Sequence, residues 1–380
     1  MSHHFVFAGG GTGGHLYPGL AIAHEIRRLD PAAAITFLTT TRQLDRDLLS
    51  RTDFRQIEQA VQPFTLHPLR IPRFLLTWRS SVAAARALFR THPPTAVLGL
   101  GGYAAGPGVV AAAKMGFATA ILNPDAIPGR ANRFLARKVD LVAMQWEASR
   151  RYFPEGARAE ALGCPIRPEF SKPVVDATPA SPGSDSRRVF DLAWNRPTLL
   201  VTGASQGART VNEAVVAVWP EFHRQHPEWQ LLHLTGKADE AFVRDAYERI
   251  KTPRDAVHVV AFTHEMWRAI GASDLVISRA GASTLAELTA LGKPSILLPY
   301  PFHRDRHQHA NAHVLTESGA AVLVEDTKDV ALTAPALRAA LEQCVDREVR
   351  GRMAAAAAKI GRPDASQKVA EWMLAAASRR

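Results

Sequence analysis

A glycine-rich loop that contains one histidine lies near the start of the chain. Residues 9–15 read GGGTGGH and lead into a helical pattern that carries Pro18. Glycines let the backbone approach a ligand closely, and the free amides at a helix N-terminus favour a phosphate or diphosphate. The pattern therefore predicts an anion site. His15 would lie where a bound diphosphate and a sugar hydroxyl meet, and its imidazole could accept the hydroxyl proton.

The same loop also fits the dinucleotide fingerprint G-x-G-x-x-G, through Gly9, Gly11 and Gly14. An NADP-dependent oxidoreductase is therefore an alternative. The acid that usually binds a ribose should follow the second strand, but residues 39–42 read TTTR there. Arg42 would suit a 2′-phosphate. Against this alternative, a dinucleotide site has no need of the histidine.

Two further loops follow segments that read as strands. Residues 101–107, GGYAAGP, follow a strand that ends at Leu100. They are a second candidate anion site, and tight turns needed only for packing are the alternative. Residues 202–209, TGASQGAR, repeat the order of strand, small-residue loop and helix start in the second half of the chain. They predict a second phosphate site.

Two polar segments in the second half could bind a sugar nucleotide. Glu287 is a lone acid in a helix and could accept two ribose hydroxyls, or it could complement the helix dipole. Residues 301–311, PFHRDRHQHAN, combine the donors and acceptors that sugar hydroxyls need. Carboxylates at metal-ligand spacing are missing there, so we predict no metal site.

The composition is typical of a globular protein with two domains. The chain has 380 residues, of which 47% are hydrophobic and 22% charged. Its two cysteines, Cys164 and Cys344, are far apart, which favours a reducing compartment and neither a disulfide framework nor a zinc site. No secretory signal pattern and no run of about 20 apolar residues is present, so we expect a cytoplasmic protein.

Short apolar runs alternate with helical patterns in both halves, as in βαβ units. A first helix is expected at 18–29, and two Ala-rich helices with a break near Gly361 and Pro363 are expected within 353–380. Ligands of parallel sheets bind at the carboxyl ends of the strands, so two facing sheets would place the site in a cleft between the domains. Strands are expected at 5–8, 35–39, 96–100, 118–122, 141–144, 198–202, 231–235, 257–261, 275–278 and 295–299.

Part of the net charge of +10 is concentrated between Glu58 and Asp125, where no acidic residue occurs. Such a surface attracts anions, and a solvated basic face is the alternative. Residues 69–76, LRIPRFLL, mix arginines with large apolar side chains. We expect this segment to touch an anionic membrane surface, and the helix after Pro72 to bury Trp78, Val82 and Phe89. The expected membrane residues are Arg70, Arg73, Phe74, Leu75 and Arg79.

Together these motifs resemble the MurG family of glycosyltransferases. Residues 205–209 (SQGAR), 279–287 (R-x-G-A-x-T-x-x-E) and 307–312 (H-Q-x-x-N-A) follow the glycine loops in the family's order and spacing, and the resemblance runs from about Phe5 to Val324. It implies an α/β chain of GT-B fold, with two Rossmann-like domains whose parallel sheets face each other across a cleft.

The resemblance also implies an activity. The family transfers N-acetylglucosamine from UDP-N-acetylglucosamine, with inversion, to the muramoyl sugar of undecaprenyl-diphospho-N-acetylmuramoyl-pentapeptide in peptidoglycan synthesis. It acts as a peripheral enzyme on the cytoplasmic face of the cell membrane. We expect no cofactor, no metal and no nucleic-acid partner.

The domain boundaries follow from the resemblance and from the Pro/Ser-rich stretch between the halves. We expect an acceptor- and membrane-binding domain at 1–167, a linker at 168–196 and a UDP-sugar domain at 197–355. A helical segment at 356–380 is expected to pack back on the first domain.

Matching positions give each site residue its expected role. His15 would act as the base. The acceptor would contact Thr12, Gly13, Gly14, Gly102 and Tyr103. The donor would contact Arg167, Ser205, Gln206, Gly207, Thr263, Glu287, His307, Gln308 and Asn311.

Two segments depart from the family, and residues 262–266, which read FTHEM for the family's Phe-Ile-Asp-Asp-Met, matter less than the other. The family usually reads His-Glu-Gln-Asn where residues 122–125 read LNPD, although Pro128, Gly129 and Asn132 are kept. Asp125 is therefore a candidate second catalytic group near the reacting hydroxyl. A different lipid acceptor is an alternative, and so is a protein that binds sugar nucleotides without catalysis.

Overall fold

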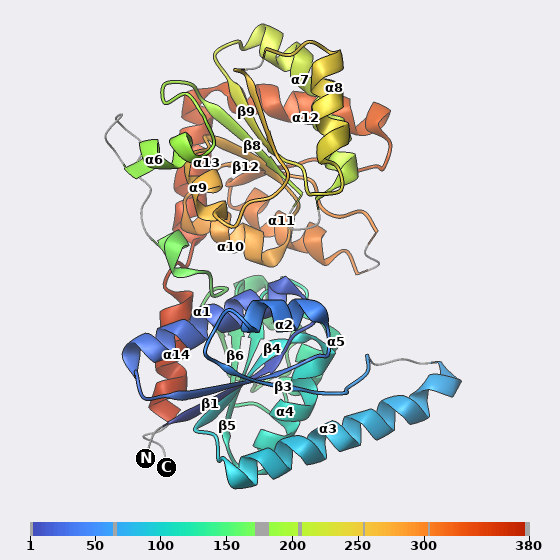
Figure 1. Ribbon diagram of the computed structural model, residues 1–380, viewed down its shortest axis with the longest axis vertical. Helices are drawn as coiled ribbons and strands as arrows, with labels where there is room; N and C mark the ends of the chain where they lie inside the picture. The colour runs from blue at the N-terminus through green and yellow to red at the C-terminus, as the bar shows by residue number, and fades with distance from the viewer. Residues whose placement is uncertain are drawn as a thin grey trace. The chain divides into compact units, whose positions relative to one another are not determined.

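The computed structural model describes residues 3–63, 67–171, 182–203, 207–253, 255–302 and 305–376. The chain forms two compact units (Figure 1). Unit 1 comprises Met1–Pro168 and Arg362–Arg380, and unit 2 comprises Glu169–Gly361. Each unit contains one parallel β-sheet with helices packed on it.

The sheet of unit 1 has seven strands in the order β3-β2-β1-β4-β5-β6-β7. All neighbouring strands are parallel. The chain moves outward from β1 to β3 and then returns to the other side of β1, so the strand order reverses between β1 and β4. Ligands of such sheets bind at this switch point, beyond the carboxyl ends of the strands. The strands are β1 (His4–Gly9), β2 (Ala34–Thr39), β3 (Arg55–Glu58), β4 (Ala96–Gly101), β5 (Ala118–Asn123), β6 (Leu141–Met144) and β7 (Ala159–Ala161).

Alternate residues of β1 enter two separate cores. Phe5 and Phe7 pack on one face of the sheet, and Val6 and Ala8 pack on the other. Because both faces are covered, the central strands are apolar along their length. The helices of unit 1 are α1 (Gly13–Leu29), α2 (Gln43–Leu49), α3 (Ile71–Thr91), α4 (Gly102–Lys114), α5 (Arg130–Leu135) and α14 (Ala365–Ala375).

The last helix of the chain completes one of these cores. Val369, Ala370 and Met373 of α14 are fully buried in the cluster that contains Phe5 and Phe7. Figure 1 shows α14 beside α1. The core of unit 1 is therefore built from both ends of the chain.

The sheet of unit 2 has six parallel strands in the order β10-β9-β8-β11-β12-β13, which reverses between β8 and β11. Its strands are β8 (Thr198–Thr202), β9 (Gln230–Leu234), β10 (Val257–Val260), β11 (Leu275–Ser278), β12 (Ser295–Leu297) and β13 (Ala321–Leu323). Its helices are α6 (Pro182–Val189), α7 (Arg209–Gln225), α8 (Glu240–Arg249), α9 (Met266–Gly271), α10 (Ala282–Ala290), α11 (His307–Glu317), α12 (Val330–Val345) and α13 (Arg347–Ile360).

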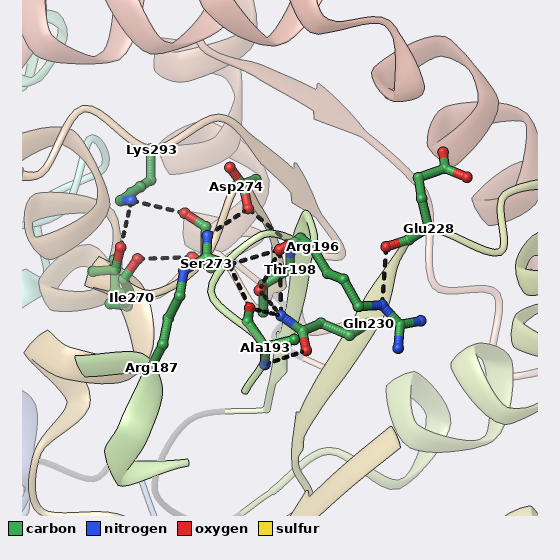
Figure 2. A network of polar contacts seen from close by, with 11 residues as sticks. Arg187, Ala193, Arg196, Thr198, Glu228, Gln230, Ile270, Ser273, Asp274 and Lys293 are labelled. Carbon is green, nitrogen blue, oxygen red and sulfur yellow. Dashed lines mark hydrogen bonds and ion pairs between the residues drawn. The ribbon is translucent and has the colours of Figure 1, made fainter. Parts of the chain in front are cut away.

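A buried arginine fixes α6 to unit 2 (Figure 2). Arg187 is 6% exposed, and its guanidinium donates to the carbonyls of Ala193 and Arg196 at 3.1 and 2.6 Å. It also donates to Asp274 at 3.2 Å, and the same carboxylate oxygen accepts the amide of Thr198. The segment that enters β8 is thus tied to the amino ends of the strands, the edge opposite to the glycine loops.

Candidate active site

The first glycine loop is folded against a buried carboxylate. Gly11 has a φ of +85°, which favours glycine. A Cβ atom on Gly10 would lie 2.4 Å from Asp45 Oδ2, so that position has no room for a side chain. The loop and the helix after it lie at the switch point of unit 1, as the motif predicts.

His15 lies in the first turn of α1, half-buried against the second loop. Its Nδ1 is 3.3 Å from the carbonyl oxygen of Gly10 and 3.1 Å from Thr12 Oγ1. Its Nε2 faces Gly101, where a Cβ atom would come within 3.2 Å. Since a carbonyl only accepts hydrogen bonds, the bond to Gly10 places the proton on Nδ1 and leaves the Nε2 lone pair free to accept a proton.

Burial lowers the pKa of His15 below its usual 6.5. The Gly10 carbonyl and the carboxylates of Asp125 and Asp45 act in the opposite direction and offset part of this effect. The imidazole is therefore neutral at pH 7, the state that a general base requires.

A cavity of about 700 Å³ in unit 1 opens beside His15. It is lined by His15 and Asp125 together with apolar side chains of α3 and α5. Of the predicted site residues it brings together His15, Gly102, Tyr103, Asp125, Phe74 and Leu75. Gly14 lines a smaller hollow beside it.

Two asparagines hold Asp125 at the cavity wall. Asn123, at the end of β5, is 1% exposed, and its Nδ2 donates to the backbone carbonyl of Asp125 at 2.9 Å. Asn132 Nδ2 donates to Asn123 Oδ1 at 3.1 Å and to the Leu122 carbonyl at 2.8 Å. The segment that departs from the MurG family pattern is therefore a fixed part of the site.

The predicted membrane residues lie on and just before α3. This helix begins at Ile71, earlier than expected, and Pro72 is tolerated in its first turn. Arg70, Arg73, Leu75 and Arg79 are exposed, and the half-buried Phe74 contacts Trp78 with ring centroids 5.9 Å apart. Val82, Phe89 and Trp78 pack on the core of unit 1, as predicted. No helix in the described parts of the chain is long and apolar enough to span a bilayer.

The predicted donor residues of unit 2 lie in loops and helices that follow its strands. Gly207 has a φ of +75°, and a Cβ atom there would lie 2.4 Å from the Thr235 carbonyl oxygen. Glu287 lies half-buried in α10. Thr263 follows β10, and its hydroxyl accepts the Glu265 amide at 3.0 Å. Ser205 and Gln206 lie outside the described residues.

The predicted residues of α11 are held by neighbouring loops. His307 Nδ1 lies 2.7 Å from Asp305 Oδ1, Gln308 Oε1 accepts the Tyr300 amide at 2.9 Å, and Asn311 donates to the Ala280 carbonyl at 3.2 Å. Arg167 belongs to unit 1, with its guanidinium 5.6 Å from the Tyr17 ring. No group of three or more His, Cys, Asp or Glu side chains in the described ranges is arranged to hold a metal ion.

A buried ion pair joins the strand ends of unit 2. Arg279 Nη1 lies 2.8 Å from Asp326 Oδ2 and donates to the Leu298 carbonyl, while Nη2 donates to Thr210 Oγ1. The pair thereby ties the start of α7 to β11 and β12. Sequence reasoning included Arg279 only as part of a motif, and Asp45 not at all. Asp45 could have been found from its position in the sequence, because it is the first acidic residue after β2.

The comparisons with known proteins assign the family. Residues 5–144 match the N-terminal domain model of glycosyltransferase family 28, and residues 198–369 match the C-terminal domain model of the same family. The chain belongs to glycosyltransferase family 28. The oxidoreductase alternative is therefore wrong, and the resemblance to the MurG family is confirmed.

Relatives within the family match over most of their length. The UDP-N-acetylglucosamine--N-acetylmuramyl-(pentapeptide) pyrophosphoryl-undecaprenol N-acetylglucosamine transferase of Desulforudis audaxviator is 40% identical over 342 residues, 88% of each chain. The protein of the same name from Desulforamulus reducens is 35% identical over 370 residues, 95% of each chain.

Solved structures share the fold of this family-28 chain. The MurG structure from Acinetobacter baumannii superposes with a TM-score of 0.78 at 24% identity and covers 99% of this chain and 100% of its own. A UDP-GlcNAc 2-epimerase from Neisseria meningitidis gives a TM-score of 0.69 at 14% identity, with 99% and 100% coverage. The predicted class of two Rossmann-like α/β domains, the GT-B fold, is confirmed.

Proposed function

We propose that this chain transfers N-acetylglucosamine from UDP-N-acetylglucosamine to the muramoyl sugar of undecaprenyl-diphospho-N-acetylmuramoyl-pentapeptide. The relatives at 40% and 35% identity, matched over nearly their whole length, carry the name of this activity. The observation that carries the proposal is the cavity of unit 1, whose lining combines a neutral histidine at the start of α1, a carboxylate and several apolar side chains. That combination suits a diphosphate-linked lipid sugar.

In the proposed reaction, the glycine loop before α1 binds the acceptor and the glycine loop before α7 binds the donor. A hydroxyl of the acceptor sugar attacks the anomeric carbon of the donor, the bond from that carbon to the diphosphate oxygen breaks, and configuration inverts. His15 Nε2 accepts the hydroxyl proton. The charge that develops on the leaving diphosphate is stabilised by amides at the start of α7, and the acceptor diphosphate by amides at the start of α1.

The two units divide the substrates. Unit 1 binds the acceptor through Thr12, Gly13, Gly14, Gly102 and Tyr103. Unit 2 binds the uridine, diphosphate and sugar of the donor. The proposed donor contacts are Arg167 of unit 1 and Ser205, Gln206, Gly207, Thr263, Glu287, His307, Gln308 and Asn311 of unit 2.

A different lipid acceptor is the second candidate. It is favoured by residues 123–125, which depart from the family pattern and line the cavity next to His15. The donor and the chemistry would be unchanged.

The proposal is tested by UDP release from UDP-N-acetylglucosamine, with and without a short-chain lipid-linked muramoyl-pentapeptide, in excess chelator. Release that depends on this acceptor and persists in chelator is expected. Binding of the donor without any release would overturn the proposed acceptor and redirect the search to other lipid sugars.

We further propose that unit 1 binds the cytoplasmic face of the membrane as a peripheral protein. Leu69 and Leu76 are 84% and 68% exposed, and Phe134 of α5 is 51% exposed at the cavity wall. Arg70, Arg73 and Arg79 lie along the same stretch of chain. Apolar side chains that insert among lipids, with basic side chains that meet the headgroups, are typical of interfacial binding.

Replacing Arg70, Arg73 and Arg79 together by glutamine is expected to weaken binding to phosphatidylglycerol vesicles by about one to two orders of magnitude. Each basic residue near an anionic surface contributes on the order of 1 kcal/mol. Vesicle co-sedimentation at low and high salt measures the effect. A control variant with Arg224, Arg249 and Arg347 of unit 2 changed to glutamine removes the same charge and should bind normally; equal weakening in both would contradict the assignment.

A further inference from the structure

The carboxylate of Asp45, which takes no part in the proposed reaction, binds the backbone of the glycine loop of unit 1. Asp45 lies in the first turn of α2 and is fully buried. Both of its carboxylate oxygens accept the Gly11 amide, at 2.8 and 2.9 Å. Its Oδ2 also accepts the amide and the hydroxyl of Thr40, at 3.0 and 2.6 Å. A buried carboxylate is costly unless it is fully hydrogen-bonded, and here the loop supplies part of that bonding.

Gly11 is held from both sides. While Asp45 takes its N–H, Arg42 Nη1 donates to its carbonyl oxygen at 2.7 Å. The neighbouring Gly10 is packed so closely on the carboxylate that only a glycine fits. Two side chains of the segment after β2 thus fix the backbone of the loop after β1.

This arrangement reverses the usual task of an acid after the second strand. In a dinucleotide-binding domain that acid points out of the protein to a ribose. Here the carboxylate points inward, and its partners are backbone groups of the glycine loop. Because the Gly11 amide already donates to Asp45, the donors available to an anion are the amides that follow it, up to Gly14. The amides of His15 and Leu16 donate to the Thr12 carbonyl.

We infer that Asp45 is a positioning residue for the acceptor, an inference that rests on the proposed function. Asp45 fixes Gly10 and Gly11, the Gly10 carbonyl holds Nδ1 of His15, and the α1 amides begin two residues beyond Gly11. A shift of this loop would move both the acceptor diphosphate and the base. Asp45, Gly11 and Thr40 all belong to unit 1, whereas the proposed donor contacts other than Arg167 belong to unit 2.

The test is Asp45→Asn, with Asp47→Asn as the matched control. Asp47 is exposed on the same helix, and its carboxylate accepts a hydrogen bond from Gln43 Nε2 at 2.7 Å. Asparagine keeps the size of the side chain but replaces one acceptor oxygen by an NH2 group, which opposes the donors of Gly11 and Thr40. Loss of a hydrogen bond to a buried charged group corresponds to a factor of about 10 or more.

We expect kcat/KM for the acceptor to fall at least about tenfold in Asp45→Asn, while the Kd for UDP-N-acetylglucosamine stays unchanged. Asp47→Asn should match the wild type in both. An acceptor kcat/KM within about twofold of the wild type, or an equal loss of donor affinity, would overturn the inference. If Asp45→Asn does not fold, Thr40→Val removes one donor to the same carboxylate and should give a smaller loss of the same kind.

Hydrogen exchange separates this inference from the proposed function. Without substrates, the peptide that contains Gly11 should exchange faster in Asp45→Asn than in the wild type, because its amide loses its acceptor. Unchanged exchange would overturn the inference even in an active enzyme. If the wild-type protein releases no UDP in the presence of the lipid-linked muramoyl acceptor, the proposed function is overturned, but the result of the exchange experiment remains valid.

Discussion

Replacing His15 by glutamine is expected to lower kcat by a factor of about 10² to 10⁴, the usual contribution of a general base. Glutamine can still donate a hydrogen bond to the Gly10 carbonyl, so the loop should keep its shape while the proton acceptor at Nε2 is lost. Steady-state turnover with both substrates saturating measures the loss. The Kd for UDP-N-acetylglucosamine should not change, since His15 is not among the proposed donor contacts.

The pH profile tests the same role in the wild type. Burial lowers the pKa of His15 below 6.5, so kcat/KM should still be at its plateau at pH 6.5. It should decline at more acidic pH, as the pH falls through the lowered pKa of His15. The charge of Asp125 raises that pKa, so Asp125→Asn should move the acid limb to lower pH. Loss of turnover in Asp125→Asn with little effect in His15→Gln would make Asp125 the base. Unchanged turnover and profile in Asp125→Asn would remove it from the catalytic group.

Unit 2 is expected to lose stability steeply in acid because of one buried histidine. His233 of β9 is completely buried, and burial lowers its pKa to about 3. Nε2 lies 3.0 Å from Asn212 Oδ1 and Nδ1 lies 3.0 Å from the Tyr247 hydroxyl. Asn212 Nδ2 donates to the Thr235 carbonyl, which fixes its oxygen toward the ring. The neutral imidazole therefore satisfies both partners.

The lowered pKa of His233 determines that unit 2 loses stability, and does not gain it, as the pH falls. The unfolded chain takes up a proton at His233 below pH 6.5, whereas the folded protein does not until pH approaches 3. Stability is full above pH 6.5 and falls as pH drops, by up to about 1.4 kcal/mol per pH unit. The free energy of unfolding should thus decrease by about 2 kcal/mol between pH 6.5 and pH 5 from this group alone.

Native-state hydrogen exchange of peptides from β9 and α7, followed from pH 7.5 to pH 5, measures this effect. His233→Gln should be less stable at neutral pH but should lose less stability on acidification than the wild type. His313→Gln removes an exposed histidine from the same unit and should keep the wild-type slope. Equal slopes in wild type and His233→Gln would contradict the assignment.

The sequence predicts the central strands well because they are buried on both faces. β1, β2, β4, β5 and β6 are runs of apolar residues, and each lies within one or two residues of its expected position. β3 is missed because RQIE, at the sheet edge, is polar and partly exposed. β7 and β13 are missed because three residues carry no recognisable period. α1 begins at Gly13 instead of Pro18, since its glycines favour a loop until tertiary contacts decide.

Some residues of the candidate site can also be predicted from the sequence, whereas others are found only in the structure. His15 and the glycine loops are found from the sequence because their residue types are themselves the chemistry. Asp45 is not, because its partner is a backbone amide 34 residues away in the sequence that only the fold brings within reach. Asp125 was identified by its difference from a family pattern, and the structure gives it a place beside His15.

The burial of α14 against α1 has a consequence for synthesis of the protein. A ribosome delivers all seven strands of unit 1 and the whole of unit 2 before residues 365–375 emerge. Until then, the apolar groove that Val369, Ala370 and Met373 will fill is open to water. Unit 2 has all its own elements by Ile360 and can mature first. The nascent first unit is thus the part of the chain most dependent on chaperones, and a single stop codon before residue 365 would leave it permanently unfinished.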